Sequence, residues 1–372
     1  MVRVLRSHAE LIANVRSFRR ALYRWYRQHA RRLPWRQQPS LYGTVVSEFM
    51  LQQTQVTTAL PYFVRWQREL PGFAELAAAP EARVLKLWEG LGYYSRARNL
   101  HRLSRALLAR DSPPRTAEEW RQLPGIGPYT AAAIASITGR QQIACVDGNV
   151  VRILSRLTAD GTAWKDTTTA ARTMAPLATA LVPKRAPGEH NQAMMELGAT
   201  VCRRRQPLCS ACPVSRFCAA THRGRPERFP CLAPRAIEAR NVARVWCLHR
   251  GALLLHRAGV RSRRLAGIHE LPSAEHLGLN PSAAQRGALL ATRQRSITRF
   301  RITETIHTVV PPRGRLPADL VWVPVPNLDA ITFSGPHRRW VREILAAREP
   351  GPALYGELPQ PEAPLRGLRP RF

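Results

Sequence analysis

The chain has 372 residues, enough for two domains of ordinary size that each bury an apolar core. Its 57 Lys and Arg outnumber 25 Asp and Glu, giving a formal net charge of +32, which favours a polyanionic partner: nucleic acid first, an anionic membrane second. An arginine-rich composition inherited from a GC-rich genome would explain the same charge without a binding role. No stretch approaches the roughly 18 apolar residues of a membrane span and the N-terminus lacks a secretory signal, so we expect a soluble cytoplasmic protein, nucleoid-associated in a bacterium.

The hydrophobic pattern changes along the chain and predicts a mainly α architecture followed by a smaller α+β domain. Residues 1–221 carry apolar residues at helical spacing between short Gly and Pro turns, which predicts an all-helical domain. Residues 222–240 lose this period and gain Pro and Arg, as in a linker. Short strands are predicted at 241–250, 252–257, 299–310 and 319–325, with a helix at 338–348. Residues 349–372 are rich in Pro and Gly and are predicted to be a disordered tail.

Early in the chain, residues 47–56 (SEFMLQQTQV) place one acid, Glu48, in a largely apolar segment that reads as a helix start. Desolvation there would raise the pKa of Glu48 and keep it protonated near neutrality, so that it could donate a proton. The alternative is an ordinary acidic residue at a helix N-terminus.

The next informative segment, residues 123–131, holds Gly125 and Gly127 in a tight turn that opens into an alanine-rich helix with Pro128 near its first position. Such a turn presents backbone N–H groups that suit a DNA phosphate, although a plain turn between helices is the alternative. About twenty residues later, Asp147 is placed to cap the following helix.

Four of the seven cysteines lie in one short segment, residues 202–218, which favours a metal site over a disulfide framework. Their spacing is C-x6-C-x2-C-x5-C, formed by Cys202, Cys209, Cys212 and Cys218. Thiolates select zinc or an iron–sulfur cluster, and the presence of a single C-x2-C favours the cluster without excluding zinc. The arginines that follow the first cysteine are suited to phosphate contact: Arg203, Arg204 and Arg205.

Together these segments resemble MutY-type adenine DNA glycosylases of the helix-hairpin-helix superfamily. The resemblance rests on residues 33–36 (LPWR), 47–56, 88–100, 123–131, 191–202 and the cysteine spacing. It implies one [4Fe–4S] cluster held by the four cysteines, with a structural and DNA-docking role. It also implies that Glu48 is the catalytic acid, that Asp147 faces the scissile sugar, and that Tyr129 and Asn149 orient these groups.

The resemblance further implies a substrate and its contacts. Gln53 and Tyr93 would wedge into the base stack beside a flipped adenine, and Arg36 and Glu196 would contact that adenine. For Glu196, an exposed helix position or a partner of the linker arginines stays open. Tyr129 occupies the position of a lysine that forms a Schiff base in bifunctional relatives, which implies hydrolysis by water.

Residues 241–348 resemble, more loosely, the Nudix-like domain with which MutY-type enzymes examine the base opposite adenine. The acidic Nudix box is missing, so nucleotide hydrolysis is not expected. Where relatives carry an F-S-H loop, this chain has residues 301–307, which offer Thr305 and His307 for mismatch recognition. A purely scaffolding domain is the alternative.

The expected activity is monofunctional removal of adenine opposite 8-oxoguanine or guanine in duplex DNA by a monomer, leaving an abasic site. An endonuclease III-like lyase or a thymine mismatch glycosylase is the enzymatic rival. A non-catalytic iron–sulfur DNA-binding protein is the rival from another class.

Overall fold

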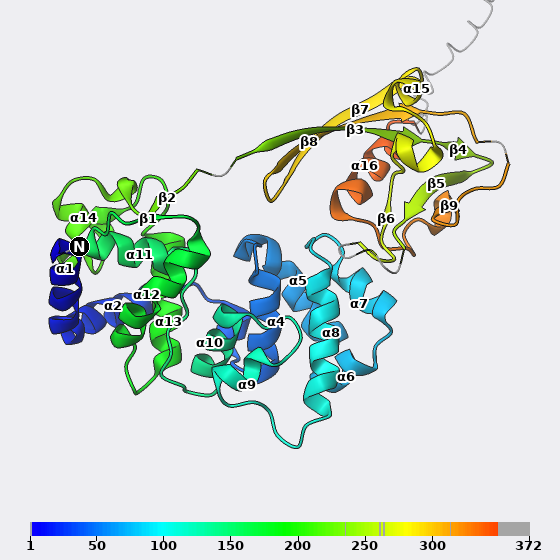
Figure 1. The fold of residues 1–372 in the computed structure, drawn as a ribbon. Helices are drawn as coiled ribbons and strands as arrows, with labels where there is room; N and C mark the ends of the chain where they lie inside the picture. The colour runs from blue at the N-terminus through cyan, green and yellow to red at the C-terminus, as the bar shows by residue number, and fades with distance from the viewer. Residues whose placement is uncertain (1, 235, 260–261, 263–264, 313, 349–372) are drawn as a thin grey trace, which may run out of the picture.

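A computed structural model describes residues 2–234, 236–259, 262, 265–312 and 314–348. The predicted tail, residues 349–372, lies outside these described residues. The molecule is elongated, with a helical part at one end and a C-terminal α+β domain at the other (Figure 1). Within the described residues, no helix is long and apolar enough to cross a membrane.

The helical part follows the predicted pattern of helices joined by short turns. Its helices are α1 (Val2–Ala13), α2 (Val15–His29), α3 (Pro34–Gln37), α4 (Leu41–Leu51), α5 (Val56–Glu69), α6 (Phe73–Ala78), α7 (Glu81–Trp88), α8 (Ser95–Leu108), α9 (Ala117–Arg121), α10 (Pro128–Ile137), α11 (Gly148–Thr158), α12 (Thr167–Leu181), α13 (Pro187–Thr200) and α14 (Ala219–His222). A short strand, β1 (Ala163–Trp164), separates α11 from α12.

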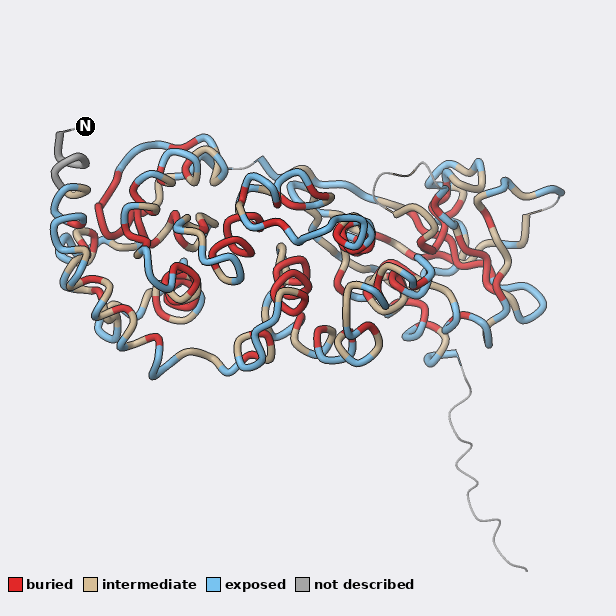
Figure 2. The backbone as a smooth tube through the Cα atoms, turned by 90° about the horizontal axis from the view of Figure 1, so that it is seen from below, coloured by how far each residue is buried: buried red, intermediate tan, exposed pale blue. Residues whose placement is uncertain are grey.

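Two hydrophobic cores hold these helices, and the chain alternates between them. One core is formed by α3 to α10 and includes the large buried side chains of Trp66, Trp88 and Trp120. The other joins α1 and α2 to α11 through α14, around Phe18 and Leu154. In Figure 2 the buried backbone segments lie at the inner faces of the helices, and the exposed segments face outward. The helical part is therefore made of two lobes, one around each core.

The hairpin between α9 and α10 confirms the predicted tight turn. Gly125 has a φ of +76°, and a Cβ added there would lie 2.5 Å from the Asn99 side chain, so both backbone and space require glycine. Gly127 is the N-cap of α10 and Pro128 is its first residue.

The C-terminal α+β domain contains two sheets flanked by helices. Its elements are β3 (Glu238–Trp246), β4 (Leu248–His249), β5 (Ala252–Arg257), β6 (His269–Glu270), α15 (Pro281–Gln285), β7 (Leu289–Ile297), β8 (Phe300–Thr308), β9 (Leu320–Pro324) and α16 (Gly335–Ala346). One sheet has the order β3-β8-β7, with β3 parallel to β8 and β7 antiparallel to it. The other has the order β4-β5-β6, with β9 paired to β5.

The predicted linker is more ordered than its composition indicates. The strand β2 (Cys231–Leu232) pairs in parallel with β1, so this segment is fastened to the helical part. The strand β3 already begins at Glu238, inside the range predicted as linker. The Pro and Arg content hid both strands because they are short or largely exposed.

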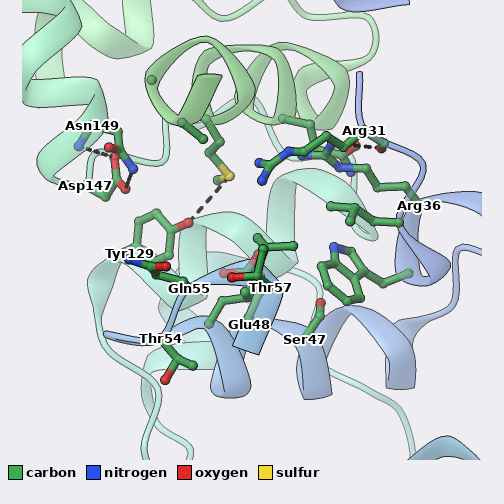
Figure 3. A pocket seen from close by; sticks show the side chains of 18 of the residues that line it. Arg31, Arg36, Ser47, Glu48, Thr54, Gln55, Thr57, Tyr129, Asp147 and Asn149 are labelled. Carbon is green, nitrogen blue, oxygen red and sulfur yellow. Dashed lines mark hydrogen bonds between the residues drawn. The ribbon is translucent and has the colours of Figure 1, made fainter. Parts of the chain in front are cut away.

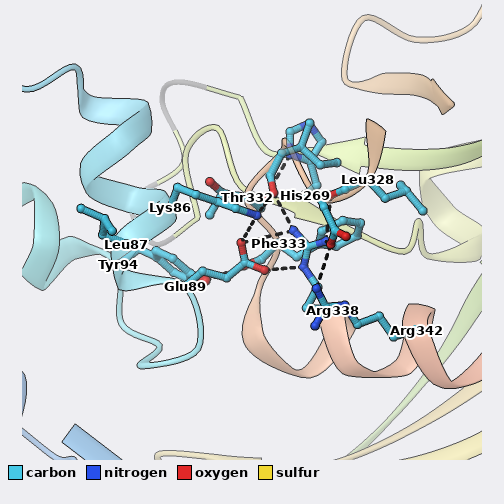
Figure 4. Close-up of polar contacts among 12 residues, drawn as sticks. Lys86, Leu87, Glu89, Tyr94, His269, Leu328, Thr332, Phe333, Arg338 and Arg342 are labelled. Atoms are coloured by element: carbon cyan, nitrogen blue, oxygen red, sulfur yellow. Dashed lines mark hydrogen bonds and ion pairs between the residues drawn. The ribbon is translucent and has the colours of Figure 1, made fainter. Parts of the chain in front are cut away.

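The α+β domain is docked onto the helical part through the end of α7 (Figure 4). The guanidinium of Arg338, on α16, forms an ion pair with the carboxylate of Glu89, and both side chains are largely buried. Two further hydrogen bonds cross this seam between the α+β domain and the helical part. They run from Lys86 Nζ to the Ile331 carbonyl at 2.7 Å and from the Tyr94 hydroxyl to the Phe333 carbonyl. The seam lies a few residues from Tyr93.

Candidate active site

A cavity of about 630 Å³ lies between the two lobes of the helical part (Figure 3). It is lined by side chains from α3, α4, α10, α11 and α13 and from the loop after α4. The sequence-predicted residues that line it together are Arg36, Glu48, Tyr129, Asp147, Asn149, Arg203 and Arg204. Residues from five separate segments of the sequence thus meet at one cavity.

Glu48 lies near the C-terminal end of α4, a helix that is buried on nearly every side. The expectation that this segment starts a helix is wrong: the helix begins at Leu41, capped by the Ser40 hydroxyl, and ends at Leu51. The alternative of an N-terminal helix charge is therefore also wrong. A carboxylate at the C-terminal end meets the negative end of the helix dipole, which disfavours ionisation.

The environment of Glu48 favours its protonated form. Burial raises the pKa of Glu48 to about 7, and the charge of Asp147 adds to the increase, while Arg36 and the Tyr129 hydroxyl oppose it. Burial and the nearby charges of Glu48 and Asp147 raise the pKa of Tyr129, so its hydroxyl stays protonated. That hydroxyl also lies 3.5 Å from the Met195 sulfur.

Asp147 is the N-cap of α11, as its position in the sequence predicted. Its Oδ1 accepts from the backbone N–H groups of Asn149 and Val150 at 2.9 and 2.8 Å, and its Oδ2 accepts from Asn149 Nδ2 at 2.8 Å. Burial raises the pKa of Asp147, whereas these donors and Arg152 oppose that shift. Because two neighbouring carboxyls cannot both ionise easily, the three donors identify Asp147 as the one that holds the charge.

Glu196 is fully buried and is held by two arginines. Its carboxylate accepts from Arg31 Nε at 2.7 Å and Nη2 at 3.0 Å, and from Arg36 Nη1 at 2.9 Å. Although burial alone would raise it, these arginines hold the pKa of Glu196 below its ordinary value. The alternatives of an exposed helix position and of a contact with linker arginines are both wrong. Sequence analysis missed Arg31, since nothing marks it among the neighbouring arginines.

Gln53 and Tyr93 are both exposed, Gln53 in the loop after α4 and Tyr93 in the loop between α7 and α8, and neither lines the cavity. Each has a left-handed backbone, with φ of 57° for Gln53 and 46° for Tyr93. A positive φ is uncommon for residues with a side chain and persists where surrounding contacts enforce it. Gly125 and Gly127 lie on the hairpin that precedes α10.

The cysteine loop follows α13 directly and is tied to α11. Arg156 donates to the Cys202 sulfur at 3.3 Å and to the carbonyls of Arg203 and Arg204 at 2.7 and 3.0 Å. Burial, together with the thiols of the other three cysteines of the loop, raises the pKa of Cys212. Arg203, Arg204 and Arg205 are exposed. Across the described residues, no group of three or more His, Cys, Asp or Glu is gathered as a single metal ion would require.

With this geometry in place, comparisons with known proteins become informative. Residues 46–178 match the model of the HhH-GPD superfamily of base excision DNA repair proteins. The chain is 39% identical over 209 residues to an adenine DNA glycosylase of Mycobacterium tuberculosis, covering 55% of this chain and 68% of that protein. The chain belongs to the adenine DNA glycosylase family.

Other members of the adenine DNA glycosylase family match a similar share of the chain. The adenine DNA glycosylase of Homo sapiens is 45% identical over 229 residues, covering 59% of this chain and 42% of that protein. The match to the one from Rattus norvegicus covers 43% of that protein, so the chain spans less than half the length of these relatives. A solved thermostable thymine-DNA glycosylase shares the fold, with a TM-score of 0.50 and 22% identity over 59% of this chain and 98% of that one.

In this family member, the segment considered as a recognition loop is a strand. Thr305 and His307 lie in β8, the central strand of its sheet, where Thr305 is flanked by Ala243 and Thr292. His307 is buried and its Nδ1 lies 3.2 Å from the Gly287 carbonyl. The structure does not bring either residue to the cavity. The turn of the β7–β8 hairpin, residues 298–299, points toward the helical part (Figure 1), and sequence analysis missed it because β7 was not predicted.

Proposed function

We propose that the chain is a monofunctional adenine DNA glycosylase of base excision repair. It would hydrolyse the N-glycosidic bond of adenine opposite 8-oxoguanine or guanine in duplex DNA and leave an abasic site. The observation that carries the proposal is the pair of carboxyls on one cavity, Glu48 with a pKa of about 7 and Asp147 with three hydrogen-bond donors. Chemistry of this kind requires one neutral and one ionised carboxyl.

The reaction follows from these protonation states. After adenine is extruded from the duplex into the cavity, Glu48 donates its proton to a ring nitrogen, N7, which turns the base into a neutral leaving group. The bond to the sugar breaks, and the Asp147 carboxylate stabilises the oxocarbenium-like sugar that forms. Tyr129 and Asn149 orient the two carboxyls, and water adds to the sugar while its released proton passes to the Glu48 carboxylate, which restores the acid. Arg36, held by Glu196, lies where it can contact the base.

Hydrolysis rather than strand cleavage is supported by the residues that line the cavity. A lyase needs an amine that attacks the sugar to form an imine. Among the described residues that line this cavity none is a lysine, and the helix after the hairpin presents Tyr129 instead. The rival reading as an endonuclease III-like lyase therefore lacks its nucleophile.

The four loop cysteines fit one [4Fe–4S] cluster. Four thiolates from one short segment are the ligand set of an iron–sulfur cluster or of zinc, and the presence of a single C-x2-C favours the cluster. Cys202, Cys209, Cys212 and Cys218 would hold the cluster, which would supply cross-linking of the loop rather than a reaction step. The exposed arginines of the loop, Arg203, Arg204 and Arg205, and the hairpin glycines, Gly125 and Gly127, would then meet DNA phosphates.

We assign residues 1–221 to catalysis, 222–240 to the connection and 241–348 to a Nudix-like domain that examines the base opposite adenine. Its docking beside Tyr93 and the direction of the β7–β8 hairpin support this division. The protein would act as a monomer, in the cytoplasm if bacterial, on DNA whose negative charge matches the net charge of +32.

A duplex panel tests the proposal. Base release is measured under single-turnover conditions from duplexes with A opposite 8-oxoguanine, A opposite G, and T opposite G, with and without borohydride. Release from the first two, with no borohydride-trapped complex, is expected. Release from T opposite G alone, or trapping, would assign the protein to a rival enzyme class, and binding without release would indicate a non-catalytic DNA-binding protein.

A further inference from the structure

A buried guanidinium without a carboxylate partner lies within the lobe formed by α3 to α10. Arg96, on α8, is 6% exposed, and no Asp or Glu of the described chain forms an ion pair with it. Burying a lone guanidinium is costly unless its donors are satisfied. Burial lowers the pKa of Arg96 to about 10, which leaves it charged at neutral pH. Its position therefore depends on the hydrogen bonds that it makes.

One side of the guanidinium holds the end of α4. Its Nη1 donates to the carbonyls of Phe49, Met50 and Gln52 at 3.0, 2.9 and 2.5 Å. The last carbonyls of a helix have no partner within the helix, and a cation at that end also complements the helix dipole. Arg96 thus fixes the segment that carries Glu48 and leads into Gln53.

The other side of the guanidinium holds the turn after α7. Its Nη2 donates to the carbonyls of Leu91 and Gly92 in this turn at 2.9 and 3.1 Å. The same Nη2 also donates to the Thr54 hydroxyl, in the loop after α4, at 3.2 Å. Its central carbon lies 5.6 Å from the centre of the Tyr93 ring. Arg96 thus fixes the segment that carries Tyr93.

These two segments are far apart in sequence, and each carries one residue with a positive φ, Gln53 and Tyr93. We propose that Arg96 is a positioning residue that holds the Gln53 and Tyr93 loops at a fixed separation, so that both side chains enter the base stack when adenine is extruded. This inference rests on the proposed function. A lysine cannot replace Arg96, because a point charge with three donors cannot reach acceptors on both sides of a planar fork.

The test compares a paired with an unpaired target base. Wild type, Arg96→Lys and Arg96→Met are assayed in single turnover on a duplex with A opposite 8-oxoguanine and on one with A opposite an abasic-site analogue, where extrusion costs less. Arg102, exposed on the same helix, supplies the control Arg102→Met. We expect both Arg96 variants to lose about 100-fold on the paired duplex, the size typical of misplaced groups, and less than about tenfold on the unpaired one. Equal losses on both duplexes would overturn the inference.

Two further measurements keep the outcome decisive. In the Tyr93→Ala background, Arg96→Lys should have little additional effect on the paired duplex, because residues that act as a unit are not additive. Full additivity counts against the proposal. Thr54→Val removes a single acceptor of Arg96 and is the milder variant if both substitutions of Arg96 prevent folding; it should show the same preference for the unpaired duplex. Wild-type protein that releases no adenine from either duplex would refute the proposed function rather than the role of Arg96.

Discussion

The carboxyl of Glu48 and that of Asp147 face one cavity from two different lobes, and burial of Glu48 together with the charge of Asp147 raises the pKa of Glu48 to about 7. An acid with this pKa is protonated in about half of the molecules at neutral pH and can give its proton to a base. The Asp147 carboxylate accepts three hydrogen bonds, from the backbone N–H groups of Asn149 and Val150 and from Asn149 Nδ2, and these favour its ionised form. The pair is therefore divided into a donor and an anion by its surroundings.

The first prediction concerns pH. At DNA concentrations well below saturation, adenine release should be fastest below pH about 7 and should fall as pH rises further, because Glu48 loses its proton. A second, acidic decline should follow protonation of Asp147, whose pKa burial raises above its ordinary value. A pH–rate profile measured with the Arg102→Met variant as control checks this. A rate that stays constant up to pH 9 would remove Glu48 from the role of acid.

The second prediction concerns the stability of Glu48→Gln. The folded protein disfavours the ionised Glu48, so wild type loses stability relative to Glu48→Gln as pH rises from about 4.5 to about 7, and the difference stays constant above that. The shift corresponds to roughly 3 kcal/mol at pH 8. Urea unfolding at pH 4 and pH 8 measures it, while base release by the variant should be abolished. A stability difference between wild type and variant that is the same at pH 4 and pH 8 would contradict the burial of an ionisable acid.

The third prediction concerns Asp147→Asn. The amide keeps an oxygen that can cap α11 but loses the negative charge, so folding and DNA binding should be retained while base release falls by about 100-fold or more. Asp147→Ala should in addition lose about 1 kcal/mol of stability, because the cap is removed. Single-turnover rates and thermal unfolding separate the two effects. Release by Asp147→Asn near the wild-type rate would refute the assignment.

The fourth prediction concerns the cysteine loop. Cys212→Ser should lower iron content, thermal stability and DNA affinity together, because the loop depends on its cross-link and carries the exposed arginines. Cys247→Ser is the matched control, since Cys247 is buried in the α+β domain away from the loop. Iron analysis, thermal unfolding and a DNA-binding titration are the measurements. Full iron content in Cys212→Ser would show that this thiol is not a ligand.

The fifth prediction concerns the seam between the two parts. Arg338→Met should speed hydrogen exchange of the amides around 331–333 and at the end of α7, since it removes the bond of Arg338 to the Ile331 carbonyl and leaves the buried carboxylate of Glu89 with the half-exposed Lys86 as its cation. Arg342→Met is the control, because Arg342 is mostly exposed. Adding Glu89→Gln to Arg338→Met should restore part of the protection. Unchanged exchange in all variants would show that the seam does not depend on this pair.

Local patterns predicted the helices, the hairpin and the helix cap of the helical part well, because short motifs determine them. The hairpin needs glycine at position 125 and proline at the first residue of α10, and the cap of α11 needs an acid, so each was readable within a few residues. The position of Glu48 within its helix could not be predicted in this way, because an apolar segment that is buried on all sides has no clear period to mark its start.

Contacts between distant segments escaped prediction. Arg31, Arg96 and Arg338 act through partners far away in the sequence, and nothing local separates them from the many solvent-exposed arginines. The strand β7 has no apolar–polar alternation in its sequence, because five polar residues follow Leu289, Leu290 and Ala291, so no local pattern marked its pairing with β8. The expectation that residues 301–307 form a loop was wrong, because these residues lie in β8 and the turn between β7 and β8, at residues 298–299, comes before them.

The pairing of β1 with β2 limits how far the C-terminal domain can travel. Because Leu232 is fixed to the helical part and β3 starts at Glu238, only residues 233–237 join the two, and a fully extended connection of that length spans about 20 Å. If Arg338 separated from Glu89, the short connection would keep the α+β domain close to the helical part, so the ion pair would re-form rapidly. Under the proposed function, this short connection would keep the α+β domain on the same duplex as the active site.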